Sequence, residues 1–182
     1  MGHTTISITG LSQKEIKSAM KQLRMYQQET SEKIVRFAWR LADIGVSFAE
    51  NNAGYFGKYI TFGRTVTAEK TGATAIVYAI NKQLIVREWK LADDTIKTAE
   101  ISPILMAEFG SGAKANNPDA GKFGMGRGTF PGQTHAFEEE WWWMTVDGEW
   151  KHSSGVSADM PMSQACSEMI ANVRKIAKEV FG

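Results

Sequence analysis

The N-terminal part of the chain carries a helical pattern that constrains the fold more than any other feature. Ser12 and Glu15 have the spacing of a capping box, in which each side chain satisfies a free backbone N–H at the start of a helix. The apolar residues that follow recur at spacings of three and four, as on one face of a helix: Ile16, Met20, Leu23, Ile34, Phe37, Ala38, Leu41, Phe48 and Ala49. We predict a helical region over about 11–52, either one long helix or two helices broken near Thr30 and Ser31, with Gly54 as its terminator.

From about residue 59 to residue 90, the spacing of apolar residues changes to the period of two that is typical of strands. Residues 59–70 and 74–80 are rich in β-branched and aromatic side chains, and Thr71-Gly72 between them is a turn candidate. We therefore predict a hairpin, and residues 84–89 can supply a third strand. Asp93-Asp94 then opens a short segment, for which a helix is one interpretation, and Pro103 forbids a long regular helix through that point.

The second half of the chain combines an irregular segment with two regular elements. Residues 110–137 are rich in glycine and carry little that could build a core, so we predict a long irregular loop that a neighbouring subunit holds. Residues 140–152 predict a second hairpin, because Asp147-Gly148 is the preferred pair for a type I′ turn. A C-terminal helix is predicted over about 161–181, since Pro161 suits a first helical turn. Its apolar stripe consists of Met162, Ala165, Cys166, Met169, Val173, Ile176, Ala177 and Val180.

These patterns predict a single α+β domain over residues 1–182, in which a long N-terminal helical region and a C-terminal helix pack on a mostly antiparallel β-sheet, with a long irregular loop.

The formal net charge of +1 argues against a protein whose main role is to coat nucleic acid. Cys166 has no second cysteine to pair with, which suits a reducing cytosol. No signal peptide and no apolar run long enough to span a bilayer are visible, so we expect no membrane partner.

Histidines and glycines do not form a recognisable metal or nucleotide site. His3, His135 and His152 lack the spacing of metal ligands, such as two histidines on successive turns of one helix. The glycine-rich run 124–128 has the composition of a phosphate loop, but it lacks the flanking strand and helix and the terminal Lys-Ser or Lys-Thr pair. We therefore predict no metal and no cofactor.

The remaining candidates for catalysis also favour structural roles. Cys166 lies on an apolar stripe, where a free cysteine usually packs as a small hydrophobe, so we expect it in the core. The glutamates at 138–140 are adjacent on a predicted strand and point to alternating faces. This arrangement favours a solvated acidic edge, or a patch that forms salt bridges with a partner, over acid–base catalysis. We predict no catalytic residues.

Four of the six tryptophans lie between residues 141 and 150, and two interpretations fit them. Aromatic rings can stack on single-stranded bases, but the adjacent glutamates would repel phosphate. Because Trp141 and Trp143 share one face of a strand and Trp142 takes the other, we favour a role in the core and in a subunit interface. A nucleic-acid site would add the loop cations Lys114, Lys122 and Arg127.

The run Met106-Ala107-Glu108-Phe109-Gly110-Ser111-Gly112 resembles the Glu-Phe-Gly-Thr/Ser-Gly signature of a bacteriophage tail-component family, which contains neck, tail-completion and minor structural proteins of long-tailed phages. Further features agree in order: the loop segment 117–121, the aromatic strand 141–143, the segment 147–155 and the stretch 158–162 that opens the final helix. In the family this last stretch is closer to Pro-Phe-Met or Pro-Phe-Leu, and here Asp159 and Met160 replace the expected Pro-Phe. The resemblance covers most of the chain and is strongest from about 100 to 181.

The resemblance implies an α+β subunit without enzymatic activity that is part of the virion and is assembled in the host bacterial cytoplasm. It implies a ring, most simply a sixfold one, that joins the head connector to the tail around the DNA channel. The partners would be further copies of the chain, other neck proteins and the tail terminator or tube, with DNA passing through without sequence-specific binding. The alternative is a single-stranded nucleic-acid-binding module built on the tryptophans. The candidate interface residues are Glu108, Phe109, Gly110, Gly112, Phe123, Arg127, Phe130, Trp141, Trp142, Trp143 and Trp150.

Overall fold

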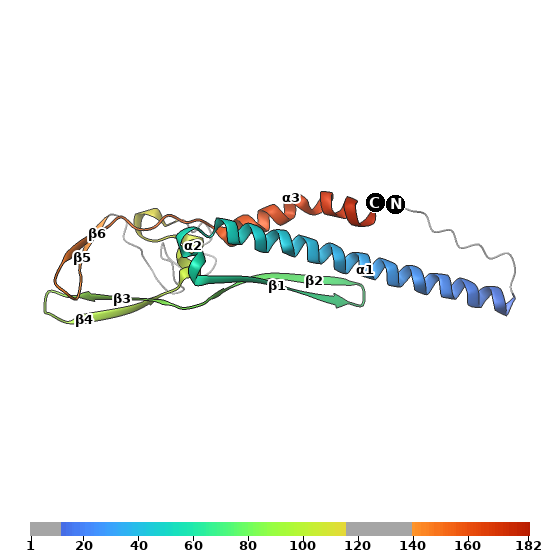
Figure 1. Ribbon diagram of the computed structural model, residues 1–182, viewed down its shortest axis with the longest axis horizontal. Helices are drawn as coiled ribbons and strands as arrows, with labels where there is room; N and C mark the ends of the chain where they lie inside the picture. The colour runs from blue at the N-terminus through green and yellow to red at the C-terminus, as the bar shows by residue number, and fades with distance from the viewer. Residues whose placement is uncertain (1–11, 116–139) are drawn as a thin grey trace.

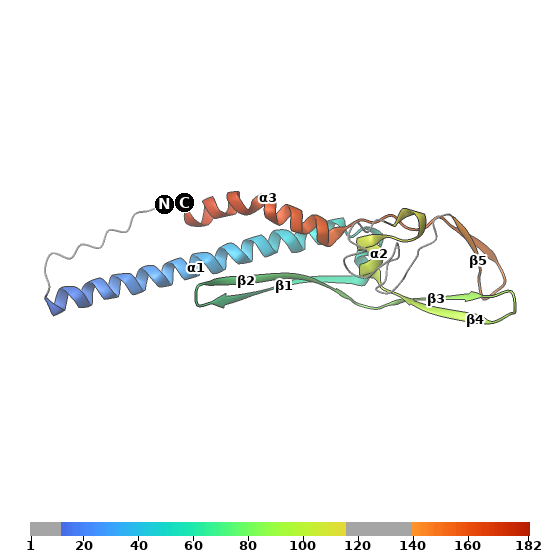
Figure 2. The same cartoon turned by 180° about the vertical axis from the view of Figure 1, so that it is seen from behind.

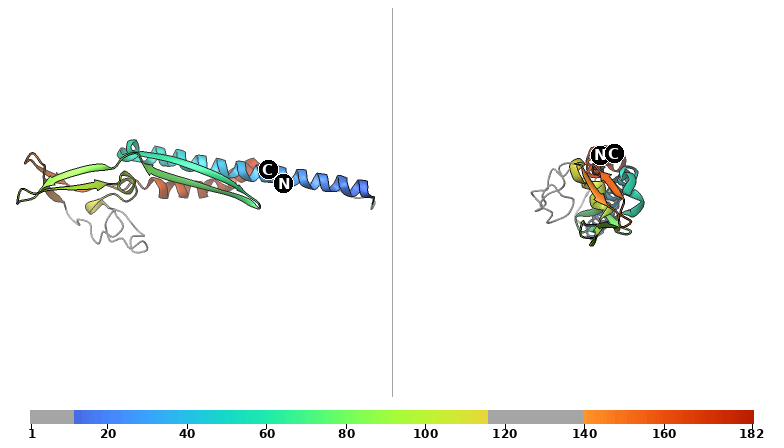
Figure 3. Two further views of the ribbon diagram at one scale, coloured as in Figure 1. Left: turned by 90° about the horizontal axis from the view of Figure 1, so that it is seen from below. Right: turned by 90° about the vertical axis from the view of Figure 1, so that its left-hand side faces the viewer.

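The computed structural model describes residues 12–115 and 140–182, and it has the predicted α+β class. The molecule is elongated (Figures 1 and 2), with a long helix, α1 (Gln13–Asn52), along one half and a β region along the other. Seen end-on, the molecule is narrow (Figure 3), because most of its elements run roughly along the long axis. A chain with this shape has a short central core and two ends that extend away from it.

The N-terminal helical region is one helix, so of the two predicted alternatives the unbroken one is confirmed. Its start has the predicted capping box: the Ser12 side chain accepts from the Glu15 N–H at 3.3 Å, and the Glu15 carboxylate accepts from the Ser12 N–H at 3.3 Å. The polar stretch near Thr30 stays helical because side chains support it locally, as in the 2.9 Å ion pair between Lys33 and Glu29 one turn away. After the C-cap Ala53, Gly54 takes a positive φ of 54° and begins the 3-10 helix η1 (Gly54–Tyr59).

The predicted hairpin forms a two-stranded antiparallel sheet from β1 (Ile60–Glu69) and β2 (Gly72–Asn81). The hairpin lies along α1 (Figure 1), and Ile60 and Phe62 on its inner face are buried against the helix region. Register places Ile76 and Ile80 on the opposite face, where both are exposed. The hairpin is therefore apolar on both faces, and the described chain covers one of them.

The next segment corrects one prediction. Residues after Asp93-Asp94 form a strand, β4 (Ile96–Ile101), paired with the predicted third strand, β3 (Ile85–Lys90), in a second sheet of order β4-β3-β5-β6. Asp94 occupies a left-handed turn position with φ 67°, which lets the chain reverse into the hairpin. Pro103 does not interrupt a helix; it begins one, α2 (Pro103–Phe109), because its missing N–H costs nothing in the first turn.

The tryptophan hairpin is present as β5 (Trp141–Met144) and β6 (Trp150–Ser153), but its turn is not the predicted type I′. Type I′ requires positive φ at both central residues, and here Gly148 has φ 84° while Asp147 does not. The Gly148 N–H donates to the Thr145 carbonyl at 2.9 Å. The loop is therefore longer than the predicted two residues, and it contains a turn from Thr145 to Gly148.

The C-terminal helix α3 (Pro161–Phe181) forms as predicted and runs antiparallel beside α1. The Phe37 and Phe181 rings lie 5.8 Å apart, and Arg40 pairs with Glu179. Cys166 is exposed, so its predicted place in the core is wrong. The rest of the chain covers only part of the apolar stripe of α3, since Cys166 and Val173 on that stripe are both exposed.

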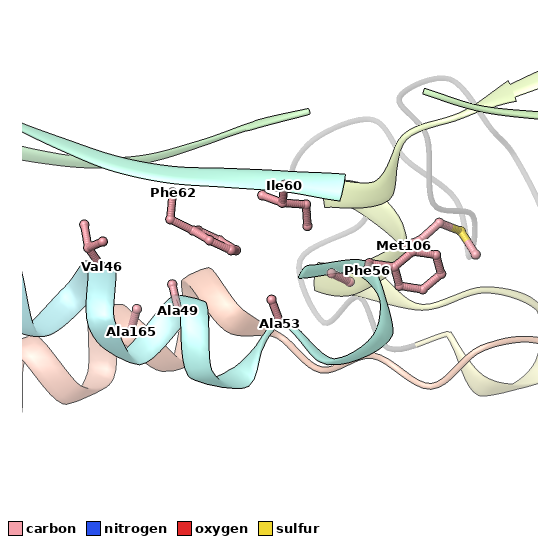
Figure 4. Close-up of a cluster of buried hydrophobic side chains, with 9 residues drawn as sticks. Val46, Ala49, Ala53, Phe56, Ile60, Phe62, Met106 and Ala165 are labelled. Atoms are coloured by element: carbon pink, nitrogen blue, oxygen red, sulfur yellow. The ribbon is translucent and has the colours of Figure 1, made fainter. Parts of the chain in front are cut away.

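The core sits where the C-terminal half of α1, η1, the start of β1, α2 and the start of α3 meet (Figure 4). It is small and built largely from alanines and a few larger side chains: Val46, Ala49, Ala53, Phe56, Ile60, Phe62, Met106, Ala107 and Ala165. Small residues allow the helices to approach closely, as at Gly45, where a Cβ would collide with Met169. This core fixes the centre of the molecule and leaves both ends outside it.

Candidate assembly site: a central junction and two exposed ends

The Glu-Phe-Gly-Ser-Gly motif begins with a buried carboxylate that caps a distant helix. Glu108 is 7% exposed, and its two oxygens accept hydrogen bonds from the backbone N–H groups of Met162 and Ser163, both at 2.9 Å. The Ser163 hydroxyl donates to the same carboxylate. Met160 at the N-cap of α3 supplies no side-chain cap, and Pro161 has no N–H. Glu108 therefore performs the capping role that Ser or Asp usually performs. Its negative charge also interacts favourably with the positive end of the helix dipole.

The next residues of the motif lock the same two segments together through the backbone. The Ser111 N–H donates to the Val156 carbonyl at 2.8 Å, and the Val156 N–H donates back at 3.1 Å. Gly110, with φ 69°, is pressed against this segment: a Cβ there would meet the Val156 carbonyl oxygen and would lie 2.8 Å from the Ala158 nitrogen. Glycine is required at this position by both conformation and space.

The last glycine of the motif lies beneath a tryptophan. Gly112 has φ 61°, and a Cβ at this position would collide with the ring of Trp141. The same Cβ would lie 3.2 Å from the Cα of Gly155, which has φ 83° and is packed against the Ser111 carbonyl. Lys114 reaches across to the Ser154 hydroxyl at 2.9 Å. We call residues 106–112 and 154–163 together the α2–α3 junction.

The junction brings together two of the pieces on which the family resemblance rests, residues 106–112 and 158–162, and it places them inside one chain. Glu108 and Gly110 were predicted to face a neighbouring subunit, and both are buried inside this chain. Within the chain, Glu108 caps α3 and Gly110 packs against the backbone of Val156 and Ala158, and an interface role for either residue stays a prediction. Phe109 and Gly112 are half-buried at the same place, so the first part of the predicted loop is an internal brace.

The tryptophan hairpin separates its rings between two faces. Cross-strand pairing joins Trp142 to His152 and Met144 to Trp150, so these four side chains share one face. Trp142 is 64% exposed and Trp150 is 66% exposed, and the Trp142 and His152 rings lie 4.8 Å apart. We call this the Trp142–Trp150 face; Trp141 and Trp143 are half-buried on the other side. The predicted division of the strand between two faces is confirmed.

The same hairpin is acidic. Between residues 140 and 153, Glu140, Asp147 and Glu149 oppose Lys151, which gives a charge of −2 with His152 neutral. Glu140 lies 2.9 Å from the imidazole of His152, on the Trp142–Trp150 face. Phosphate would be repelled here, whereas a cationic or amphipathic protein surface would be attracted.

The opposite end of the molecule is the N-terminal half of α1, which extends beyond α3 and the β1–β2 hairpin (Figure 1). Every residue from 20 to 29 is exposed, including Met20, Leu23 and Tyr26. The sequence interpretation missed this surface, since it placed the whole apolar stripe on one helix face and expected the helical region to pack on the sheet. The available signal was the cluster of basic residues beside the stripe between residues 14 and 24.

A further exposed cluster of polar side chains lies on η1. The Lys58 ammonium sits 4.2 Å from the centre of the Tyr55 ring and 4.9 Å from that of Tyr59. Hydrogen bonding to Tyr59 and Lys58, with the nearby positive charges, lowers the pKa of Tyr55. Hydrogen bonding to Tyr59 raises the pKa of Lys58. These shifts describe mutually stabilised surface groups and not a buried reactive centre.

The described residues offer little that resembles a substrate or metal site. A shallow groove of about 340 Å³ runs beside α1 and α3, lined by Asp43, Ile44, Ser47, Phe48, Asn51 and Glu168. Asp43 is paired there with Arg64. In residues 12–115 and 140–182, no group of three histidine, cysteine, aspartate or glutamate side chains could hold a metal ion. Over the same ranges, no helix has both the length and the apolar character needed to cross a membrane.

Several predicted residues fall outside the described chain. These are His3, His135, the run 124–128, Glu138, Glu139, Lys122 and the interface candidates Phe123, Arg127 and Phe130. Comparison of the chain with protein-family models, with curated proteins and with solved structures finds no match.

Proposed function

We propose that the chain is a non-enzymatic structural subunit that functions by assembling with other copies and with partner proteins. One observation carries this proposal: large apolar side chains are mostly outside the core. Among the described residues, eighteen large hydrophobic side chains are exposed, whereas seven buried hydrophobic residues are larger than alanine. Exposed apolar surface on this scale is typical of protein interfaces.

The resemblance stated above supports a more specific form of the proposal. In that form the chain is a neck or tail-completion protein of a long-tailed bacteriophage, part of the virion and assembled in the bacterial cytoplasm. Supporting this, the motif residues from Glu108 to Gly112 and the segment from Ser154 to Ser163 pack against one another in the α2–α3 junction. Because these two segments form one structural unit, we expect them to occur together, and in the same order, in related chains.

The proposed assembly is a closed ring, most simply sixfold, around the channel through which DNA leaves the head. An elongated subunit with a different exposed apolar surface at each end suits heterologous contacts, in which one surface of a copy meets a different surface of the next. Such contacts give a ring when the rotation closes. The other partners would be neck proteins and the tail terminator or tube.

The oligomeric state in solution tests the proposal. We expect native mass spectrometry to show a discrete oligomer in equilibrium with monomer, and electron microscopy of that oligomer to show rings with a central opening. A chain that stays monomeric at the highest concentration that remains in solution, both alone and with its neighbouring neck proteins, would contradict a structural assembly role.

A nucleic-acid-binding module remains the second candidate, because Trp142 and Trp150 are exposed and could stack on bases. The carboxylates of the same hairpin oppose it. Fluorescence titration with a single-stranded oligonucleotide at low salt distinguishes the two functions. Salt-dependent quenching that disappears in Trp142→Ala would favour nucleic-acid binding, and no quenching at low salt would remove that candidate.

A further inference from the structure

The exposed half of α1 combines an apolar stripe with a row of positive charges. Ile16, Met20 and Leu23 recur at spacings of four and three and are all exposed. Lys17, Lys21 and Arg24 follow a second row at spacings of four and three, beside the first. With Lys14 and Glu15 included, residues 13–24 carry a charge of +3, from four cations and one anion.

Three local features of this segment are unfavourable in an isolated subunit. Like charges one turn apart repel, and cations near a helix N-terminus oppose the helix dipole. A projecting helix also gains little stability without packing of its apolar face. Local conflicts of this kind in a natural sequence indicate a surface that is completed by a partner. The partner should be acidic, and it should offer apolar side chains to the stripe.

The other end of the same subunit meets both requirements. The Trp142–Trp150 face presents two exposed indole rings, and the hairpin that carries it has a charge of −2. Tryptophans are common anchors at the centres of interfaces, and carboxylates at the rim steer a cationic partner. Asp147 lies in the exposed turn of that hairpin, and Glu140 is exposed on the face itself beside His152, so both carboxylates can meet lysines on an incoming helix.

We propose that the N-terminal half of α1 of one copy docks on the Trp142–Trp150 face of a second copy. This inference rests on the proposed assembly function and assigns two of its surfaces. Two α1 segments would repel one another through their matching positive charges, and two hairpins through their negative ones. Because the two surfaces lie at opposite ends of the subunit (Figure 1), the contact is heterologous and can repeat from copy to copy.

Charge reversal with rescue tests the contact. The double variant Lys17→Glu with Lys21→Glu should weaken self-association roughly tenfold or more, because attraction becomes repulsion at the same positions. Glu140→Lys with Asp147→Lys should weaken it similarly. Combining all four changes should bring the dissociation constant back to within about threefold of the wild-type value, since complementarity returns with opposite signs. Sedimentation equilibrium or native mass spectrometry measures each constant.

A matched control separates a local effect from an effect of net charge. Lys70→Glu with Lys97→Glu changes the net charge by the same amount at two exposed positions on other hairpins, and it should leave self-association unchanged. Trp142→Ala should weaken self-association roughly 30-fold, as expected for an anchor side chain. Circular dichroism checks that the helix persists, which glutamate near a helix N-terminus should favour.

The outcomes distinguish this inference from the proposed function. If the wild-type chain forms no oligomer, the proposed function fails and the contact fails with it. If the wild type forms an oligomer that both double variants leave intact, or if the fourfold variant is no better than either double variant, the assembly role stands and this contact is overturned. Binding of a single-stranded oligonucleotide that Lys17→Glu with Lys21→Glu abolishes, without any change in self-association, would also overturn the contact.

Discussion

The α2–α3 junction and the two ends of the subunit use similar residue types in opposite ways. At the junction, Glu108 is buried and accepts three hydrogen bonds within its own chain. At the ends, Glu149 and Lys21 are exposed. Trp141 covers Gly112, whereas Trp142, the next residue, is 64% exposed. The centre is completed by the chain itself, and the ends are arranged as if a second molecule completes them.

This difference separates stability from assembly. Substitutions in the core and the junction should destabilise the isolated subunit, while substitutions at the ends should leave its stability almost unchanged. Paired substitutions on either side of the boundary can break or sharpen this distinction.

The largest expected effect comes from the core. Phe62 is buried between the β1–β2 hairpin and α1, so Phe62→Ala should lower the free energy of unfolding by about 4 kcal/mol. Ile80 lies on the exposed face of the same hairpin, and Ile80→Ala should cost less than about 1 kcal/mol. Urea denaturation followed by far-ultraviolet circular dichroism measures both. Equal losses would mean that the outer face of the hairpin is also covered within the monomer.

Gly110 in the junction should be nearly as sensitive to substitution. Gly110→Ala places a Cβ against the Val156–Ala158 backbone at a positive φ, so we expect a loss of about 3 kcal/mol. Gly72→Ala is the control, because no atom lies within 4 Å of a Cβ at that position. Thermal unfolding compares the two variants, and a Gly110→Ala protein as stable as Gly72→Ala would refute the close packing of the junction.

Loss of the carboxylate that caps α3 should have a somewhat smaller effect. Glu108→Gln keeps the size of the side chain but places an amide donor against backbone N–H groups, so we expect a loss of about 2 kcal/mol. Glu88→Gln, on an exposed strand position, should change the free energy of unfolding by less than about 0.5 kcal/mol. Urea denaturation again gives the comparison, and matching midpoints for the two variants would show that the cap contributes nothing.

Two neighbouring tryptophans give the smallest and most direct contrast. Trp141→Ala removes the ring that covers Gly112 and should cost about 2 kcal/mol of subunit stability. Trp142→Ala removes an exposed ring and should change stability by less than about 0.5 kcal/mol. Measurements at a concentration where the subunit is monomeric keep the effect of assembly out of the comparison. The reverse order of stabilities would contradict the assignment of the two faces.

Local patterns predicted much of the fold. The capping box at Ser12, the alternation in the first hairpin and Pro161 at the start of α3 each carry a short-range physical signal, and each element formed where that signal lies. The interpretation of the segment after Asp93-Asp94 was wrong because aspartate is common both at helix starts and in turns. In the structure Asp94 forms a left-handed turn. The sequence indicated that no long helix runs through Pro103. In the structure Pro103 is the first residue of α2.

The junction could not be predicted in the same way. Glu108 caps α3 through the N–H of Met162, which lies 54 residues later, and no local pattern links the two positions. Gly110 was recognised through its motif, but a motif does not reveal whether a close approach lies within the chain or between chains. Cys166 was misplaced because periodicity gives the direction of an apolar stripe and not the width that a neighbouring helix covers.

Hydrogen–deuterium exchange, measured on the dilute monomer and on the concentrated oligomer, tests the distinction between centre and ends most directly. In the monomer we expect slow exchange for amides in residues 46–62 and 103–112 and fast exchange in residues 13–30 and 141–153. Oligomer formation should slow exchange in the latter two segments and leave the centre unchanged. Strong protection of residues 13–30 in the monomer, or no change in either end on assembly, would contradict the account.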